Sequence, residues 1–138
     1  MLQRAIARCF SKRREIAAAY IFGSAAAGRT RPDSDVDIAV LLSQPMPASR
    51  ALSYRLKLMA EVGAALHRAD VDLVLLNDAP PLLAHRVLSK GRLVFERSRS
   101  ARVRFQVLTA GRYADLVPMY ETQIRYLKRQ ARSGGGRG

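Results

Sequence analysis

Tyr20-Ile21-Phe22-Gly23-Ser24 and, ten residues later, Asp35-Val36-Asp37-Ile38-Ala39-Val40 are the stretches that decide the fold. Each contains an apolar run of strand length, and the first run ends at a glycine and a serine. Side chains alternate along a strand with a period of two, so Asp35 and Asp37 project to the same face. The sequence therefore predicts two strands of one sheet, with a glycine-serine corner beside a pair of carboxylates.

The corner and the carboxylates together have the chemistry of a phosphoryl-transfer site. Gly23 and Ser24 offer backbone N–H groups and a hydroxyl, and Ser24 is expected to cap a short helix over residues 25–27, whose dipole favours phosphate. Two adjacent carboxylates repel one another unless a cation lies between them, and hard oxygen ligands suit Mg²⁺. We expect two metal ions, one for a triphosphate and one for an attacking hydroxyl.

A later strand supplies the third carboxylate that such a site requires. In Asp70-Val71-Asp72-Leu73-Val74-Leu75-Leu76, Asp72 lies inside the apolar run, whereas Asp70 stands at its start. We therefore expect Asp72 to complete the metal site and to act as general base, with Asp70 exposed.

Helices and strands are expected to alternate through the first hundred residues. Apolar spacing predicts helices over residues 2–18, 48–67 and 82–89, and strands over 19–22, 36–42, 71–76 and 91–95. The remainder is predicted to be helical, with an apolar stripe at Val103, Val107, Ala110, Ala114 and Val117 and a restart or kink at Pro118. We expect an α/β fold, a small mixed β-sheet flanked by helices with a basic C-terminal helical segment, forming one domain over 1–132 with a flexible tail over 133–138.

The charge of the chain is concentrated at its ends. The net charge is +13, with five basic and no acidic residues over 1–14 and nine basic and two acidic residues over 98–138. Such flanks favour an acidic or polyanionic partner, either protein or RNA. The apolar run over 16–22 is far shorter than the roughly 20 residues that span a bilayer, and the basic N-terminus lacks the features of a secretory signal. We therefore expect a cytoplasmic protein that does not enter membranes.

The quoted motifs resemble the signature of the DNA polymerase β-type nucleotidyltransferase superfamily. The similarity is greatest to its minimal branch, the MNT or MntA-like antitoxins of HEPN/MNT toxin–antitoxin pairs. It extends to Val71-Asp72-Leu73, to the segments 82–91 and 92–96, and to Tyr113-Ala114-Asp115-Leu116 in the basic C-terminal helix. The resemblance thus covers nearly the whole chain.

The resemblance implies a minimal nucleotidyltransferase fold and transfer of AMP from ATP to a tyrosine of a cognate HEPN ribonuclease, within a hetero-oligomer. It also implies that Gly23 and Ser24 bind the triphosphate, and that the three aspartates Asp35, Asp37 and Asp72 bind Mg²⁺. Many relatives carry a basic residue before the second glycine of the loop, where this chain has Ala27. We expect Arg29 or Arg31 to supply that charge to the nucleotide.

Two alternatives to this function stay open. A catalytically weak antitoxin would neutralise a ribonuclease by binding alone, through the basic flanks. Nucleotidyl transfer to RNA or to a small molecule would keep the chemistry and change the acceptor, although only about forty residues follow the predicted sheet. Neither histidine has a partner at metal-ligand spacing, so His67 and His85 are expected on helix surfaces, and Tyr113 is expected to be a packing residue.

Overall fold

The computed structural model describes residues 2–23 and 35–135. Its elements are α1 (Leu2–Ser11), β1 (Ile16–Phe22), β2 (Val36–Leu42), α2 (Ala48–Leu66), β3 (Val71–Leu75), the 3₁₀ helix η1 (Leu76–Asp78), α3 (Pro81–Lys90), β4 (Arg92–Glu96) and α4 (Arg99–Gly135). The helix expected over 25–27, with its Ser24 cap, lies outside the described residues. The helix expected over 48–67 is α2, which ends at Leu66 because His67 adopts a left-handed conformation.

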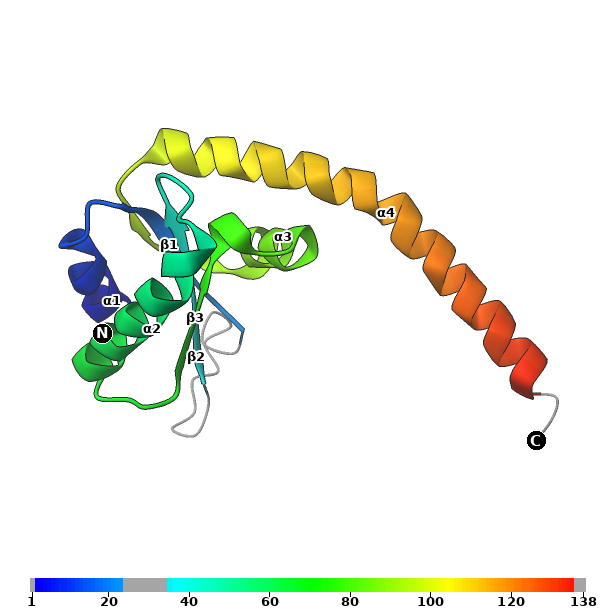
Figure 1. Cartoon of the computed structure of the whole chain (residues 1–138), viewed down its shortest axis with the longest axis horizontal. Helices are drawn as coiled ribbons and strands as arrows, with labels where there is room; N and C mark the ends of the chain where they lie inside the picture. Colours follow the sequence, from blue (N-terminus) through cyan, green and yellow to red (C-terminus); the bar gives the residue numbers. More distant parts are fainter. Residues whose placement is uncertain (1, 24–34, 136–138) are drawn as a thin grey trace.

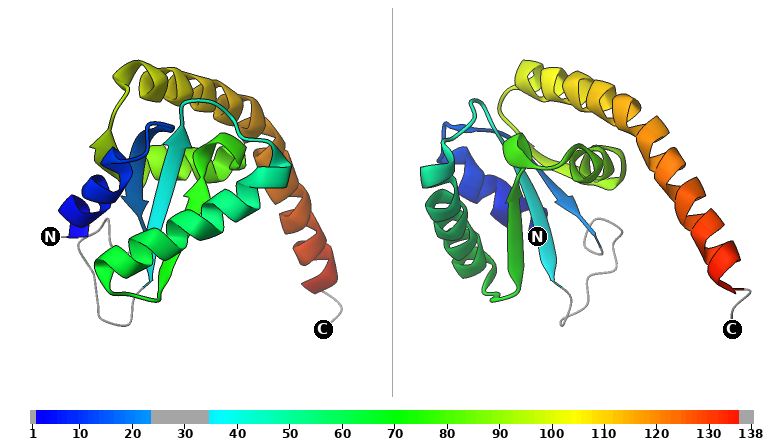
Figure 2. Two further views of the ribbon diagram at one scale, coloured as in Figure 1. Left: turned by 60° about the vertical axis from the view of Figure 1, so that its left-hand side comes forward. Right: turned by 45° about the vertical axis from the view of Figure 1, so that its right-hand side comes forward.

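The four strands form one mixed sheet in the order β3-β2-β1-β4. β1 runs antiparallel to β2 and β4, and β2 runs parallel to β3, to which α2 connects it. Figure 2 shows α1 and α2 on one face of this sheet and α3 and α4 on the other. Two buried clusters fill these layers, one around Phe10 and Leu58 beneath α1 and α2, the other around Tyr20 and Val87 beneath α3 and α4. The predicted α/β fold with a mixed sheet is confirmed.

The prediction of one helix over residues 2–18 is wrong. α1 ends at Ser11, where the Arg97 guanidinium donates a hydrogen bond of 2.7 Å to the Ser11 carbonyl oxygen, and β1 begins at Ile16. Helix propensity favoured Ala17 and Ala18 as helical. They are instead buried in a central strand that pairs on both sides, where the small side chain suits the close packing of two helical layers.

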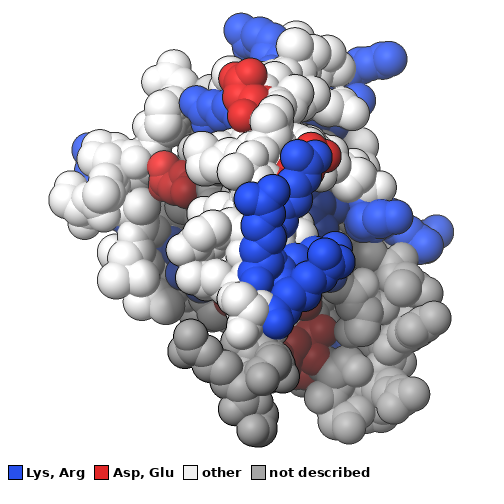
Figure 3. All heavy atoms as spheres, turned by 90° about the vertical axis from the view of Figure 1, so that its right-hand side faces the viewer, with Lys and Arg blue, Asp and Glu red and all other residues white. Residues whose placement is uncertain are grey.

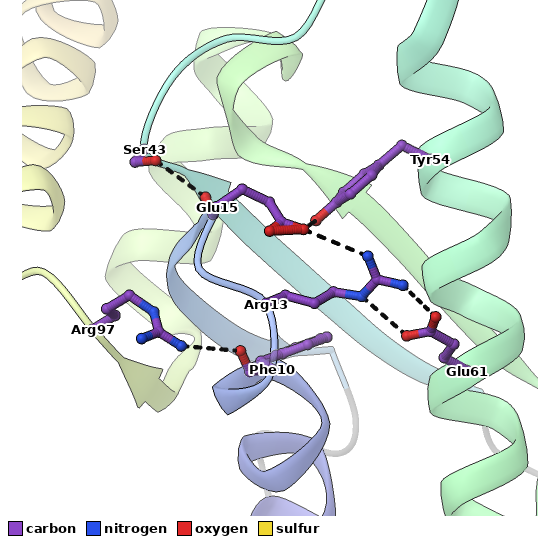
Figure 4. Close-up of polar contacts among 7 residues, drawn as sticks. All are labelled: Phe10, Arg13, Glu15, Ser43, Tyr54, Glu61 and Arg97. Atoms are coloured by element: carbon purple, nitrogen blue, oxygen red, sulfur yellow. Dashed lines mark hydrogen bonds and ion pairs between the residues drawn. The ribbon is translucent and has the colours of Figure 1, made fainter.

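Polar contacts fix the corner between α1 and β1 against α2 (Figure 4). The Arg13 guanidinium forms ion pairs with Glu61 of α2 and, at 3.5 Å, with Glu15. The Tyr54 hydroxyl donates to Glu15 Oε1 at 3.2 Å, and burial together with the Glu15 charge raises the pKa of Tyr54 above its ordinary value. The Glu15 carbonyl accepts the Ser43 N–H at 2.9 Å. This network joins α1, β1 and α2 into one rigid corner.

The C-terminal helix α4 is a single helix that leaves the domain halfway along its length. Figure 1 shows a bend and no break in α4, as expected for Pro118 inside a helix. Ala101 and Phe105 pack against the sheet, but Val103 and Val107 of the predicted apolar stripe are 41% and 68% exposed. The helix continues to Gly135, and so includes the start of the segment predicted as a tail. Among the residues described, no helix combines the length and apolarity needed to cross a bilayer.

Candidate functional site

The register of the sheet brings two of the predicted carboxylates together. Asp37 of β2 is the direct partner of Asp72 in the parallel strand β3, and on its other side it pairs with Phe22 at the end of β1. Asp35 precedes β2 by one residue, so it shares the face of Asp37 by strand alternation. Ala39, two residues after Asp37, belongs to the buried cluster beneath α3 and α4, so the carboxylates lie on the face that these helices cover.

Burial and neighbouring negative charges both oppose the ionisation of Asp37. Burial raises the pKa of Asp37 above its ordinary value, and the charges of Asp72 and Asp35 raise it further. Oxygen ligands of like charge at one place are the donor set that Mg²⁺ takes in proteins, so the residue types fit a magnesium site. Within the described residues, no three His, Cys, Asp or Glu side chains lie close enough to hold an ion as they stand.

An arginine of α2 forms an ion pair with Asp72, so the Asp72 carboxylate does not point toward Asp37 to share an ion with it. Arg55 Nη2 lies 3.3 Å from Asp72 Oδ1, and Arg55 Nε donates to the carbonyl oxygen of Leu73 on the free edge of β3. The Asp72 side chain is 52% exposed, so it has room to turn from Arg55 toward Asp37. The structure thus places Asp72 on the same face as Asp37, and a turn toward Asp37 would take it away from Arg55.

Asp70 pairs with an arginine of the turn before β3. Arg68 donates to both carboxylate oxygens of Asp70, at 2.8 and 2.6 Å. These bonds lower the pKa of Asp70 below its ordinary value. The Asp70 side chain is therefore paired within the turn before β3, although it is half-buried where we expected it exposed.

Gly23 has a backbone conformation that favours glycine, and it lies directly against Asp37. Its φ is +72°, in the left-handed region. A Cβ built on it would lie 2.5 Å from Asp37 Oδ2, closer than side-chain atoms approach one another. The glycine therefore lets the end of β1 lie directly against the central carboxylate. Ser24, Arg29 and Arg31 lie outside the described residues, so their roles in nucleotide binding stay predictions.

Asp37 and Gly23 open into a cavity of about 930 Å³, within the size range of small-molecule sites. The sheet provides its floor, and α3 and α4 provide its walls. Besides Gly23 and Asp37, its polar lining consists of His85, Arg86, Ser89 and Lys90 of α3 and Tyr113 of α4. A ligand of nucleotide size therefore fits in this cavity beside Asp37.

Five residues at or near this cavity were not found by sequence reasoning. His85 and Tyr113, expected on a helix surface and in packing, stack on each other with ring centroids 3.6 Å apart and join α3 to α4. Arg86 and Lys90 had a signal in the sequence, since basic residues four apart share one side of a helix. Arg55 had none, because its contact depends on how α2 crosses the edge of the sheet.

A comparison with protein families gives one match. The model of the family described as polymerase beta, nucleotidyltransferase matches residues 4–100. No curated protein is significantly similar to the chain.

Solved structures with the same fold come from toxin–antitoxin complexes. A toxin–antitoxin with AMP-PNP is 26% identical over 93% of this chain and 99% of the other, with a TM-score of 0.77. A mutant of the MntA toxin–antitoxin is 26% identical over 91% of this chain and 97% of the other, with a TM-score of 0.74. A tri-AMPylated HEPN toxin with MNT antitoxin from Shewanella oneidensis is 24% identical over 93% and 99%, with a TM-score of 0.69, and this likeness shows the fold alone.

Proposed function

The chain belongs to the polymerase β nucleotidyltransferase family, and on this premise we propose that it transfers AMP from ATP to a tyrosine of a cognate HEPN toxin. In doing so it acts as an antitoxin. The observation that carries the proposal is the position of Asp37, which lies against Gly23, pairs in register with Asp72 and lines a cavity of nucleotide size. The similar toxin–antitoxin with AMP-PNP supports ATP as the substrate.

The reaction is a substitution at the α-phosphorus of ATP. The acceptor oxygen forms a bond to this phosphorus, the bond from phosphorus to the bridging oxygen breaks, and pyrophosphate leaves. Asp72 is assigned as the base that takes the hydroxyl proton, because it is exposed on the face of Asp37. Gly23, Ser24 and Arg29 are assigned to the triphosphate. Two Mg²⁺ ions held by Asp35, Asp37 and Asp72 would neutralise the phosphates and acidify the hydroxyl.

The outer part of α4 is proposed to dock the toxin. All described side chains over 121–133 are exposed, and four of them are basic: Arg125, Lys128, Arg129 and Arg132. Figure 3, which views the molecule from the side toward which α4 projects, shows Lys and Arg side chains gathered on this face. Such a surface favours an acidic partner and a hetero-oligomeric assembly. The need for ATP and Mg²⁺ supports a cytoplasmic location.

The activity is tested by incubating the chain with labelled ATP, Mg²⁺ and its HEPN partner. We expect label on a tyrosine of the partner, loss of labelling with EDTA and with the double substitution Asp35→Asn/Asp37→Asn, and normal labelling with the exposed control Asp78→Asn. A partner that stays unlabelled, or full labelling by the double variant, would refute the proposal.

The same variants separate the proposal from its alternatives. An antitoxin that acts by binding alone would still neutralise the toxin with Asp35→Asn/Asp37→Asn, and would lose neutralisation when Arg125, Lys128 and Arg129 are reversed to Glu. Transfer to RNA would instead appear as labelled RNA together with binding that weakens steeply as salt rises. We expect the aspartate variant to lose neutralisation, because the toxin then remains unmodified.

A further inference from the structure

Helix α3 presents two cations to the cavity that contains Asp37. Arg86 and Lys90 both line it, and a spacing of four residues places them one above the other on the same side of the helix. Both side chains are exposed. Within the described part of the chain, neither forms a hydrogen bond or an ion pair, and neither lies within ion-pair distance of Asp37. The two cations therefore line the same cavity as the Asp37 carboxylate, without an ion pair to any described residue.

The end of α3 is fixed next to the glycine corner. The Gly91 N–H donates to the Val87 carbonyl at 2.7 Å and ends the helix, and Arg92 then pairs with Ile21 near the end of β1. A Cβ on Gly91 would lie 3.1 Å from the Ile21 carbonyl oxygen, so the two backbones are in close contact. Lys90 is thus held at the end of the cavity where Gly23 lies, and Arg86 one helical turn farther along.

This arrangement puts the Asp37 carboxylate on the floor of a cavity of about 930 Å³ and the Arg86 and Lys90 cations on one of its walls. A ligand that satisfies both charges must bring a bound divalent cation to Asp37 and negative charge to α3. A nucleoside triphosphate complexed with a divalent metal has this distribution, with its β- and γ-phosphates carrying most of the charge beyond the reacting phosphorus. If Arg86 and Lys90 served only to solvate the surface of α3, there would be no reason for both to line the cavity that contains Asp37.

We propose that Arg86 and Lys90 bind the β- and γ-phosphates of ATP and hold the pyrophosphate as it leaves. This rests on the proposed function, because it concerns the leaving group of that reaction. Arg86 can offer a two-pronged donor to phosphate oxygens, whereas Lys90 offers a compact charge beside Gly23. As the bond to the α-phosphorus breaks, negative charge grows on the bridging oxygen, and cations placed there stabilise the transition state.

The proposal is tested by the binding of three ligands to the full chain in the presence of Mg²⁺: AMP-PNP, AMP and inorganic pyrophosphate. Charge-assisted hydrogen bonds to phosphate predict that Arg86→Gln and Lys90→Gln each weaken AMP-PNP binding about tenfold or more. Pyrophosphate binding should weaken similarly. AMP binding should change less than twofold, because AMP lacks the two outer phosphates.

Matched controls are available on the opposite face of the sheet. Arg50→Gln and Lys57→Gln remove exposed cations from α2 and should leave all three affinities unchanged. Lys90→Arg should keep most of the AMP-PNP affinity, because it keeps the positive charge beside the phosphates. Circular dichroism checks that each variant is folded.

The outcomes distinguish this inference from the proposed function. AMP-PNP affinity equal to wild type in both Gln variants, or an equal loss for AMP, overturns the inference even if toxin labelling is intact. A wild-type chain that binds no AMP-PNP overturns both. Selective loss of AMP-PNP and pyrophosphate affinity, with AMP unaffected, supports the assignment to the outer phosphates.

Discussion

Replacing Gly23 by alanine changes the candidate site through a single methyl group. Alanine at φ +72° meets the steric penalty of the left-handed region, about 1–2 kcal/mol. Alanine also makes the unfolded chain less flexible than glycine does, which offsets roughly 0.4–1 kcal/mol of this steric penalty. The net loss of folding stability should therefore be about 1 kcal/mol, which leaves a domain of ordinary stability folded.

The effect on activity should be much larger than the effect on stability. The new Cβ would lie 2.5 Å from Asp37 Oδ2, so the carboxylate must move by about 1 Å to reach ordinary contact. A displacement of that size at reacting groups can lower the rate about a hundredfold. We therefore expect Gly23→Ala to reduce the rate of AMP transfer about a hundredfold, at a temperature where the variant is fully folded.

The assay pairs denaturant unfolding with the rate of toxin labelling, and Gly111→Ala is the matched control. Gly111 lies inside α4, where a Cβ would meet no atom within 4 Å, so alanine there should stabilise the chain by about 0.5–1 kcal/mol and leave the rate unchanged. Wild-type labelling by Gly23→Ala would refute the reasoning. So would a loss of rate that merely follows the unfolded fraction.

The remaining predictions concern stability. Asp37→Asn should raise the free energy of unfolding at neutral pH, because the pKa of Asp37 is raised in the folded chain and the ionised carboxylate therefore opposes folding. This gain should vanish as the pH falls below 3.8, the ordinary pKa of the group, and urea titrations of the wild type and the variant at several pH values measure it. Gly91→Ala should destabilise by about 1–3 kcal/mol in thermal melts, since its Cβ would collide with the Val87 carbonyl oxygen, and wild-type stability would contradict this. Arg97→Ala should cost about 1–2 kcal/mol, because it removes the donor to the carbonyl oxygens at the end of α1, whereas the exposed neighbour Arg99→Ala should have no effect in the same urea titration.

Local signals predicted the central part of the fold and the core of the site. The strand over 36–42 and the helix that follows it have strong periodicity, and the structure has both. The choice of Asp72 as the partner of Asp37 followed from its position inside an apolar run, and the structure places the two side by side in parallel strands. The comparisons confirm the predicted family.

Features that depend on tertiary contact were beyond the sequence. Apolar stripes in the sequence located the helices but not the faces by which they pack. Leu52 and Leu56 of α2 are 61% and 54% exposed, and Val103 and Val107 of α4 are also largely exposed. The boundary between α1 and β1 was missed because alanine favours a helix locally. Pairing with β2 and β4, which lie far away in the sequence, places these alanines in a central strand. The bond of Arg55 to Asp72 joins elements that no spacing rule connects.

The exposure of α4 beyond Tyr120 has a thermodynamic consequence. No tertiary packing supports the described side chains over 121–133, so this arm depends on its own helical propensity, which is marginal for a segment of that length. Its amides should exchange with solvent far sooner than those of the sheet, and heating should melt the arm before the domain unfolds. A bound subunit that covers the arm would merge these two transitions into one.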